Sequence, residues 1–237
     1  MTKGVPKKSK KENTTTQKTS HFELSRIVPL TPNQQKTFDA YSSGFQLQLH
    51  GFAGTGKTFI SIYLALKEIL DLKSPYKKIV IIRSVVPSRD MGFLPGSIKE
   101  KTRIFEEPYM EICNTIFSRG DGWEILKTKN LIEFTTTSFL RGTTFNDAIV
   151  IVDETQNMTF PEIDTIMTRM GENSRVIFCG DYRQTDLNKR DEKEGITKFI
   201  LITDKLKSFK HIEFQKEDIV RSSLVKSYII EKTNLGF

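Results

Sequence analysis

An eight-residue loop, GFAGTGKT, constrains the fold of this chain more than any other feature. It matches the pattern G-x-x-x-x-G-K-[ST], with a strand-like run at 45–49 before it and a helical pattern at 56–71 after it. The glycines allow tight turns that point successive backbone N–H groups at phosphate oxygens, and the positive end of the following helix attracts the same anions. An ordinary glycine turn is the alternative, but the complete pattern with both flanks favours a phosphate-binding loop. Its residues are Gly51, Phe52, Ala53, Gly54, Thr55, Gly56, Lys57 and Thr58.

Two side chains of this loop have a defined chemical role in the pattern. The Lys57 ammonium can reach the β- and γ-phosphates, and the Thr58 hydroxyl can join the coordination shell of Mg²⁺. The loop therefore predicts a phosphate site that works with Mg²⁺.

Short β-branched runs alternate with longer helical patterns along the rest of the chain, which indicates an α/β domain. The runs KIVIIR and AIVIVDE are apolar on both sides of the pleat, as is typical of buried parallel strands. The fold class is thus α/β, with a doubly wound, mostly parallel sheet flanked by helices. We predict strands at 45–49, 78–83, 131–135, 148–152, 175–179 and 211–214, helices at 32–41, 56–71, 97–117, 160–170, 194–204 and 218–233, and an exposed charged loop at 186–195.

Two carboxylates follow the buried strand at 148–152 directly. Asp153 and Glu154 are therefore expected at the carboxyl edge of the sheet, where ligands bind in open α/β folds. Asp153 would hold Mg²⁺ directly or through water, and Glu154 would orient and polarise an attacking water. A lone glutamate at a strand end can be an ordinary surface residue, but beside a phosphate loop it indicates hydrolysis.

The next buried strand ends in another polar cluster, GDYRQ, at the same sheet edge. The amide of Gln184 can hydrogen-bond both the attacking water and the γ-phosphate. In combination with the loop and the acid pair, this is typical of a sensor coupled to hydrolysis.

The distribution of charge and the composition indicate further features of the chain. Residues 1–20 contain six lysines and one glutamate, so they carry +5 of the net charge of +7. We expect this polar stretch to be a disordered basic tail that either binds nucleic-acid phosphates or is simply solvated, followed by one domain at 21–237. Cys113 and Cys179 lack metal-ligand spacing and are expected to be free buried thiols. The absence of a secretory or membrane-spanning pattern predicts a soluble cytoplasmic protein without a membrane partner.

The chain resembles the PhoH-like ATPase family from about Thr31 almost to its last residue. The supporting stretches are TPNQQ, GFAGTGKT, IIRSVVPS, MGFLPGSIKEK, FLRGTTFNDAIVIVDETQN, TRMGENSRVIFCGDYRQTDL and EDIVRSSLV, of which GFLPG followed by Glu100 and Lys101 is the most diagnostic. The resemblance implies a single RecA-like domain, related to the cores of superfamily-one helicases, that hydrolyses ATP with Mg²⁺.

The same resemblance implies roles for three residues outside the motifs above. Gln34 matches a glutamine that reads adenine, Arg221 matches an arginine proposed to contact the γ-phosphate, and Arg169 matches a further family arginine. Thr155 stands where the family usually has alanine, a small change that should leave catalysis intact. The catalytic set expected on these grounds is Glu154, Lys57, Gln184 and Arg221.

A single RecA-like domain per chain favours an active site at a subunit interface, completed by an arginine of the next subunit. We therefore expect a homo-oligomer, for instance a ring. RNA or single-stranded DNA is the expected polymer partner, because basic groups with exposed aromatics suit single strands. Phe93 and Phe145 are either stacking platforms or core residues. A small-molecule kinase and a non-catalytic ATP-binding assembly module are the competing functions. A kinase would need an arginine-rich lid and a specific acceptor pocket, and the sequence shows neither pattern. Loss of Glu154 or Lys57 would have favoured the assembly module, and both residues are present. The basic candidates for nucleic-acid contact are Arg83, the loop 89–93, Lys99, Lys101, Arg103 and Arg141.

Overall fold

A computed structural model describes residues 23–84, 98–140, 142–182 and 195–235. Its centre is a six-stranded sheet in which every pair of neighbouring strands is parallel. The order across the sheet is β3-β2-β4-β5-β1-β6, so the chain crosses the sheet in both directions from β1, as a doubly wound fold requires. The strands are β1 (Gln46–Gly51), β2 (Lys78–Arg83), β3 (Ile132–Thr136), β4 (Ala148–Asp153), β5 (Arg175–Gly180) and β6 (Phe209–Phe214).

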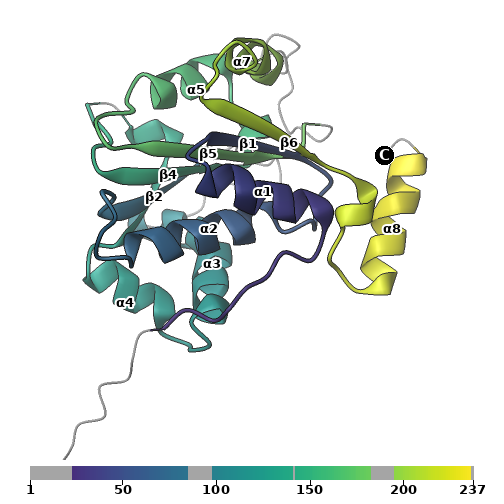
Figure 1. Ribbon diagram of the computed structural model, residues 1–237, viewed down its shortest axis with the longest axis horizontal. Coiled ribbons are helices and arrows are strands. Elements are labelled where there is room, and N and C mark those ends of the chain that lie inside the picture. The colour runs from purple at the N-terminus through teal and green to yellow at the C-terminus, as the bar shows by residue number, and fades with distance from the viewer. Residues whose placement is uncertain (1–22, 85–97, 141, 183–194, 236–237) are drawn as a thin grey trace, which may run out of the picture.

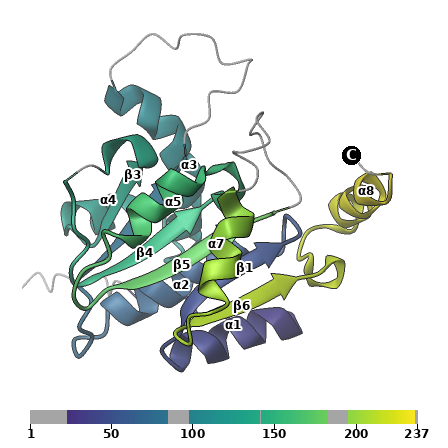
Figure 2. The same cartoon turned by 90° about the horizontal axis from the view of Figure 1, so that it is seen from above.

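Helices cover both faces of the sheet (Figure 1 and Figure 2). One face carries α1 (Pro32–Ser42), α2 (Lys57–Ile69), α3 (Ile98–Ile116) and α4 (Gly122–Thr128). The other face carries α5 (Phe160–Met167) and α7 (Gly195–Thr203), and α8 (Ser223–Asn234) stands apart beyond the end of β6. The short 3-10 turns are η1 (Thr137–Phe139), η2 (Thr155–Asn157) and η3 (Lys216–Asp218).

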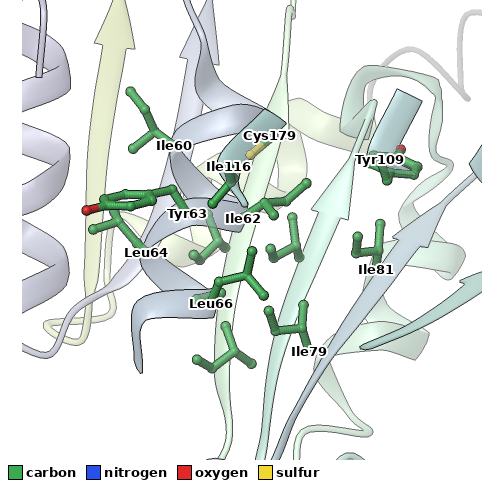
Figure 3. Close-up of a cluster of buried hydrophobic side chains, with 14 of the residues drawn as sticks. Ile60, Ile62, Tyr63, Leu64, Leu66, Ile79, Ile81, Tyr109, Ile116 and Cys179 are labelled. Carbon is green, nitrogen blue, oxygen red and sulfur yellow. The ribbon is translucent and has the colours of Figure 1, made fainter. Parts of the chain in front are cut away.

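Two apolar clusters, one on each face of the sheet, hold these layers together. Every residue of β4 and of β5 is buried, which explains why their sequences are apolar on both sides of the pleat. Figure 3 shows the larger cluster, in which side chains of α2 such as Ile62 and Leu66 meet Ile79 and Ile81 of β2. Both cysteines are free and buried, as predicted. No helix within the described ranges is long and apolar enough to cross a bilayer.

The six predicted strands are all confirmed, each within two residues at either end. Helix α5 is shorter than predicted: it ends at Met167, and three residues later Met170 forms a β-bridge with Phe145. The sequence patterns missed α4, a short helix built around the buried Trp123. The predicted loop at 186–195 and the predicted tail at 1–20 lie outside the described residues, apart from Gly195.

The helix predicted at 218–233 was also wrong at its start. It begins only at Ser223, and η3 precedes it. Between the two, Ile219 has an extended backbone and the N–H of Val220 donates to the Gly54 carbonyl at 3.0 Å. This segment therefore makes a hydrogen bond to the phosphate-binding loop instead of continuing a helix.

Candidate nucleotide-binding site

Three neighbouring strands, β4, β5 and β1, end at the same edge of the sheet and bring the predicted motifs together. The loop 51–58 follows β1, the acid pair lies at the end of β4, and Asp181 follows β5. The closest link is the Thr58 hydroxyl, which donates to Asp153 Oδ1 at 2.8 Å although the residues are 95 positions apart. Strand order alone thus assembles one site from distant segments.

The entry to the loop 51–58 is packed directly against β6. Gly51 has a φ of +116°, and a Cβ there would lie 2.0 Å from the Phe214 carbonyl oxygen. The N–H of Phe52 donates to the same carbonyl at 3.0 Å. Only glycine fits this backbone conformation and this close approach. This explains why the first position of the motif is a glycine.

Helix α2 starts inside the loop without a side-chain cap. Its N-cap is Gly56, in the left-handed conformation, and this residue has no side chain to bond the first backbone N–H groups of the helix. Uncapped N–H groups and the helix dipole make such an end attractive to anions. The backbone of the loop therefore fits the phosphate role that the motif predicts.

Lys57, the first residue of α2, is buried, with 9% of its surface exposed. Its ammonium donates to the carbonyls of Gly51 at 2.8 Å and Phe52 at 2.7 Å. Burial lowers the pKa of Lys57, while the neighbouring Cys179, Asp181 and Asp153 oppose this effect. Carbonyl groups of the loop thus bind the ammonium group that the motif assigns to the phosphates.

The carboxylate of Asp153 is held on both oxygens. Oδ1 accepts from the Thr58 hydroxyl, and Oδ2 accepts from the Tyr109 hydroxyl at 2.9 Å. Burial and the adjacent charge of Glu154 raise the pKa of Asp153, although the two hydroxyl groups act in the opposite direction. Hydroxyl and carboxylate oxygens are the hard ligands that Mg²⁺ prefers. Within the described part of the chain, no group of three or more His, Cys, Asp or Glu residues is arranged to hold a metal ion by itself. An ion on Thr58 and Asp153 would therefore take its other ligands from phosphate and water, as Mg²⁺ usually does.

Glu154 has an unusual backbone, with φ +53° and ψ +42°. A non-glycine residue in this region costs roughly 1–3 kcal/mol and is found preferentially at functional sites. Its carboxylate accepts a hydrogen bond from Gln156 Nε2, and Gln156 Oε1 accepts from the N–H of Asp181 at 3.0 Å. Sequence reasoning missed Gln156; the signal was an amide side chain two residues after the acid pair.

Thr155, between these two residues, ties the same turn to β5. Its hydroxyl donates to the Cys179 carbonyl at 2.8 Å, and the residue is fully buried. The threonine at this position therefore links η2 to the neighbouring strand by a hydrogen bond.

Gln34 lies against the loop, at the start of α1. Its Nε2 donates to the Thr55 carbonyl at 3.0 Å, and its Oε1 accepts from the N–H of Leu30 at 2.7 Å. These two bonds fix which way the amide points, and they use one of its two N–H groups and one of its two oxygen lone pairs. The predicted position beside the nucleotide is compatible with this geometry.

Arg221 lies against the loop at Gly54. A Cβ on Gly54 would come within 2.9 Å of Arg221 Cγ, so the side chain crosses the loop at its left-handed glycine. The residue itself is exposed. The structure thus brings Arg221 to the loop of its own chain, whereas Gln184 lies outside the described residues.

The candidates for nucleic-acid contact divide into three groups. Phe145 is 2% exposed and belongs to the smaller apolar cluster, so it is a core residue and not a stacking platform. Arg83 lies over the Phe105 ring, 5.7 Å from its centroid, and Arg103 is exposed. Arg169, the further family arginine, is not one of these candidates; it donates to the Thr143 carbonyl at 3.0 Å ahead of the start of β4, at the end of the sheet away from the phosphate loop. The loop 89–93 with Phe93, the side chains of Lys99 and Lys101, and Arg141 lie outside the described residues.

Comparison with known proteins places the chain among relatives of one family. It is 34% identical to the PhoH-like protein of Bacillus subtilis (strain 168) over 181 residues, which cover 76% of this chain and 55% of that protein. It is 33% identical to the protein PhoH of Escherichia coli (strain K12) over 176 residues, covering 73% of this chain and 49% of that protein. The chain therefore spans about half the length of these curated relatives.

A solved structure supports the fold. The large terminase from a thermophilic bacteriophage aligns with a TM-score of 0.51 at 12% identity, covering 85% of this chain and 50% of the terminase chain. This likeness concerns the fold alone, a parallel sheet flanked by helices. The family model described as PhoH-like protein matches residues 26–232, and the chain belongs to that family.

Proposed function

We propose that this chain is an Mg²⁺-dependent ATPase of the helicase-like kind. The observation that carries the proposal is the Thr58–Asp153 hydrogen bond of 2.8 Å with Glu154 held one residue further on. It aligns an Mg²⁺-binding pair beside a second carboxylate that can orient water. A phosphate-binding module without chemistry has no use for this third group.

The residues divide the work as follows. The loop N–H groups and Lys57 bind the phosphates, and Thr58 and Asp153 hold Mg²⁺, which neutralises charge on the phosphate oxygens. Glu154 orients a water and accepts its proton, with Gln156 fixing the Glu154 carboxylate. Gln34 reads adenine through its amide. Gln184 senses the γ-phosphate, and Arg221 stabilises the charge that develops on it.

The proposed use of hydrolysis is remodelling or unwinding of RNA or single-stranded DNA. The support is the family resemblance, the six lysines of residues 1–20 and the exposed Arg103. Contacts of this kind are mainly electrostatic, so stimulation by nucleic acid should weaken as salt increases.

A homo-oligomer, with ATP at the interface between subunits, is part of the proposal. Its support is α8, which follows Arg221 and exposes Leu224 and Tyr228 by 79% and 67%, with its C-cap residue Leu235 exposed by 69%. Large apolar side chains grouped on a helix next to a site are typical of an interface. A protein that stays monomeric at micromolar concentration with ATP and Mg²⁺, while hydrolysing at full rate, would contradict this part.

The deciding experiment is ATP turnover by the purified chain, with and without single-stranded RNA or DNA. Glu154→Gln is the matched control, because it keeps the size of the side chain and removes the base; turnover should fall by about 10²–10⁴-fold. Stimulation by nucleic acid supports the full proposal. Turnover that ignores nucleic acid favours a protein partner instead, and turnover unchanged in Glu154→Gln refutes the assignment of Glu154.

A further inference from the structure

Tyr109 of α3 lies outside the motifs described above, yet it contacts the proposed metal site directly. Its hydroxyl donates to Asp153 Oδ2 at 2.9 Å, while the Thr58 hydroxyl donates to the other oxygen of the same carboxylate. The three groups come from three elements, α3, α2 and β4. Asp153 is thereby fixed from a helix that carries no part of the phosphate loop or of the acid pair.

The tyrosine is held in place by its surroundings. Its side chain is 1% exposed, and its ring packs beside that of Phe134 with 5.5 Å between the centroids. Figure 3 shows it in the same apolar cluster as Ile79 and Ile81 of β2. Because the ring is packed on all sides, its hydroxyl is held in one position, next to Asp153.

The hydroxyl is not needed for packing. A phenylalanine would fill the same apolar space, and a buried hydroxyl costs free energy unless it is hydrogen-bonded. The Tyr109 hydroxyl meets this requirement by donating to Asp153 Oδ2 at 2.9 Å. The polar atom of Tyr109 therefore has its use at the carboxylate of Asp153.

We propose that Tyr109 is a positioning residue for the Mg²⁺ ligand Asp153, and that it sets the affinity of the nucleotide site for the ion. A carboxylate held on both oxygens cannot rotate about its Cβ–Cγ bond, whereas one held by Thr58 alone can. Groups that orient metal ligands in this way typically change metal affinity by about 10–100-fold. This inference rests on the proposed Mg²⁺-nucleotide function.

The test is the binding of ADP to the full chain by titration calorimetry at increasing Mg²⁺ and in EDTA. Tyr109→Phe should raise the Mg²⁺ concentration needed for half-maximal enhancement of ADP binding by about tenfold or more. Its ADP affinity in EDTA should equal that of the wild type, which also shows that the variant is folded. Tyr63→Phe is the matched control. It removes the same hydroxyl from another buried tyrosine, whose partner is the N–H of Ile27 and not Asp153.

A second comparison separates positioning from a general structural effect. In an Asp153→Asn background, Tyr109→Phe should cause no further change in the Mg²⁺ dependence, because the residue acts through Asp153. An unchanged Mg²⁺ requirement in Tyr109→Phe, or an equal shift in Tyr63→Phe, would overturn the inference. If ADP binding by the wild type does not depend on Mg²⁺ at all, it is the proposed function that fails.

Discussion

Gln156 holds the carboxylate of Glu154 through its Nε2 while its Oε1 accepts from the backbone of Asp181, the residue after β5. One amide thus joins the acid pair at the end of β4 to the neighbouring strand. The backbone of Glu154 is in a left-handed conformation that only surrounding contacts can maintain. Gln156 is the contact that fixes the side chain.

Replacing Gln156 with leucine should lower ATP turnover by up to about 10²-fold, because a misplacement of a reacting group by about 1 Å can cost that much. ATP binding should change little, since the amide of Gln156 bonds to Glu154 and Asp181 and the phosphates are bound by the loop. Steady-state turnover and nucleotide titration measure the two effects. Gln35→Leu, an exposed glutamine on α1, is the control for the chemical change. Equal turnover in the two variants would show that Glu154 needs no orientation.

Arg221 reaches the phosphate loop of its own chain, which predicts that it acts within one subunit. Arg221→Ala should lower turnover by about 10³-fold or more if it stabilises the developing charge. Mixing Arg221→Ala with Glu154→Gln then separates two arrangements of the site. Mixed oligomers should stay inactive when both residues serve the same site from the same chain. Recovery of turnover on mixing would show that the arginine is supplied by a neighbouring subunit.

Gly51→Ala should destabilise the protein by about 3 kcal/mol or more, because the added Cβ meets a backbone carbonyl in addition to the strain of a positive φ. The added Cβ would lie 2.0 Å from the Phe214 carbonyl oxygen. Gly44→Ala is the matched control: its φ is +88°, but nothing lies within 4 Å of the added atom. Urea unfolding of that variant should show a loss of only about 1–2 kcal/mol. Similar losses of unfolding free energy in both variants would mean that β6 can shift to accommodate the added Cβ.

Asp218 provides a pH-dependent test of how the start of α1 is attached to η3. It is 2% exposed and accepts from Asn33 Nδ2 at 2.7 Å and from the N–H of Gln215 at 2.8 Å. Burial alone would raise the pKa of Asp218, but these hydrogen bonds and one from Thr31 outweigh it and lower the pKa. A lowered pKa contributes stability above the unfolded value of about 3.9, and this contribution is lost as pH falls through the folded value.

Asp218→Asn should therefore cost about 1–3 kcal/mol of unfolding free energy at pH 7. The difference from the wild type should shrink once the pH falls below about 4. Urea denaturation across this pH range measures it. A difference that does not depend on pH would mean that Asp218 acts by shape and not by charge.

The phosphate loop, the acid pair and all six strands were predictable from the sequence because each is a local pattern. A run of apolar residues indicates that the same residues form a buried strand, and a glycine motif indicates the backbone conformation of the same loop. Gln34 and Arg221 came from the family resemblance, and the structure places both against the loop. Phe145 remained ambiguous because a phenylalanine in a loop looks the same whether it is exposed or buried; only its packing in the smaller apolar cluster decides it.

The sequence by itself determined the six strands, the phosphate loop and the acid pair, since hydrophobic periodicity and motif spacing act over a few residues. Tertiary structure decided which of those elements are neighbours. The strand order placed Asp153 within 2.8 Å of Thr58, and packing of α3 brought Tyr109 to the same carboxylate. Contacts between residues tens of positions apart depend on how the layers close around a shared core, and no local pattern records that closure.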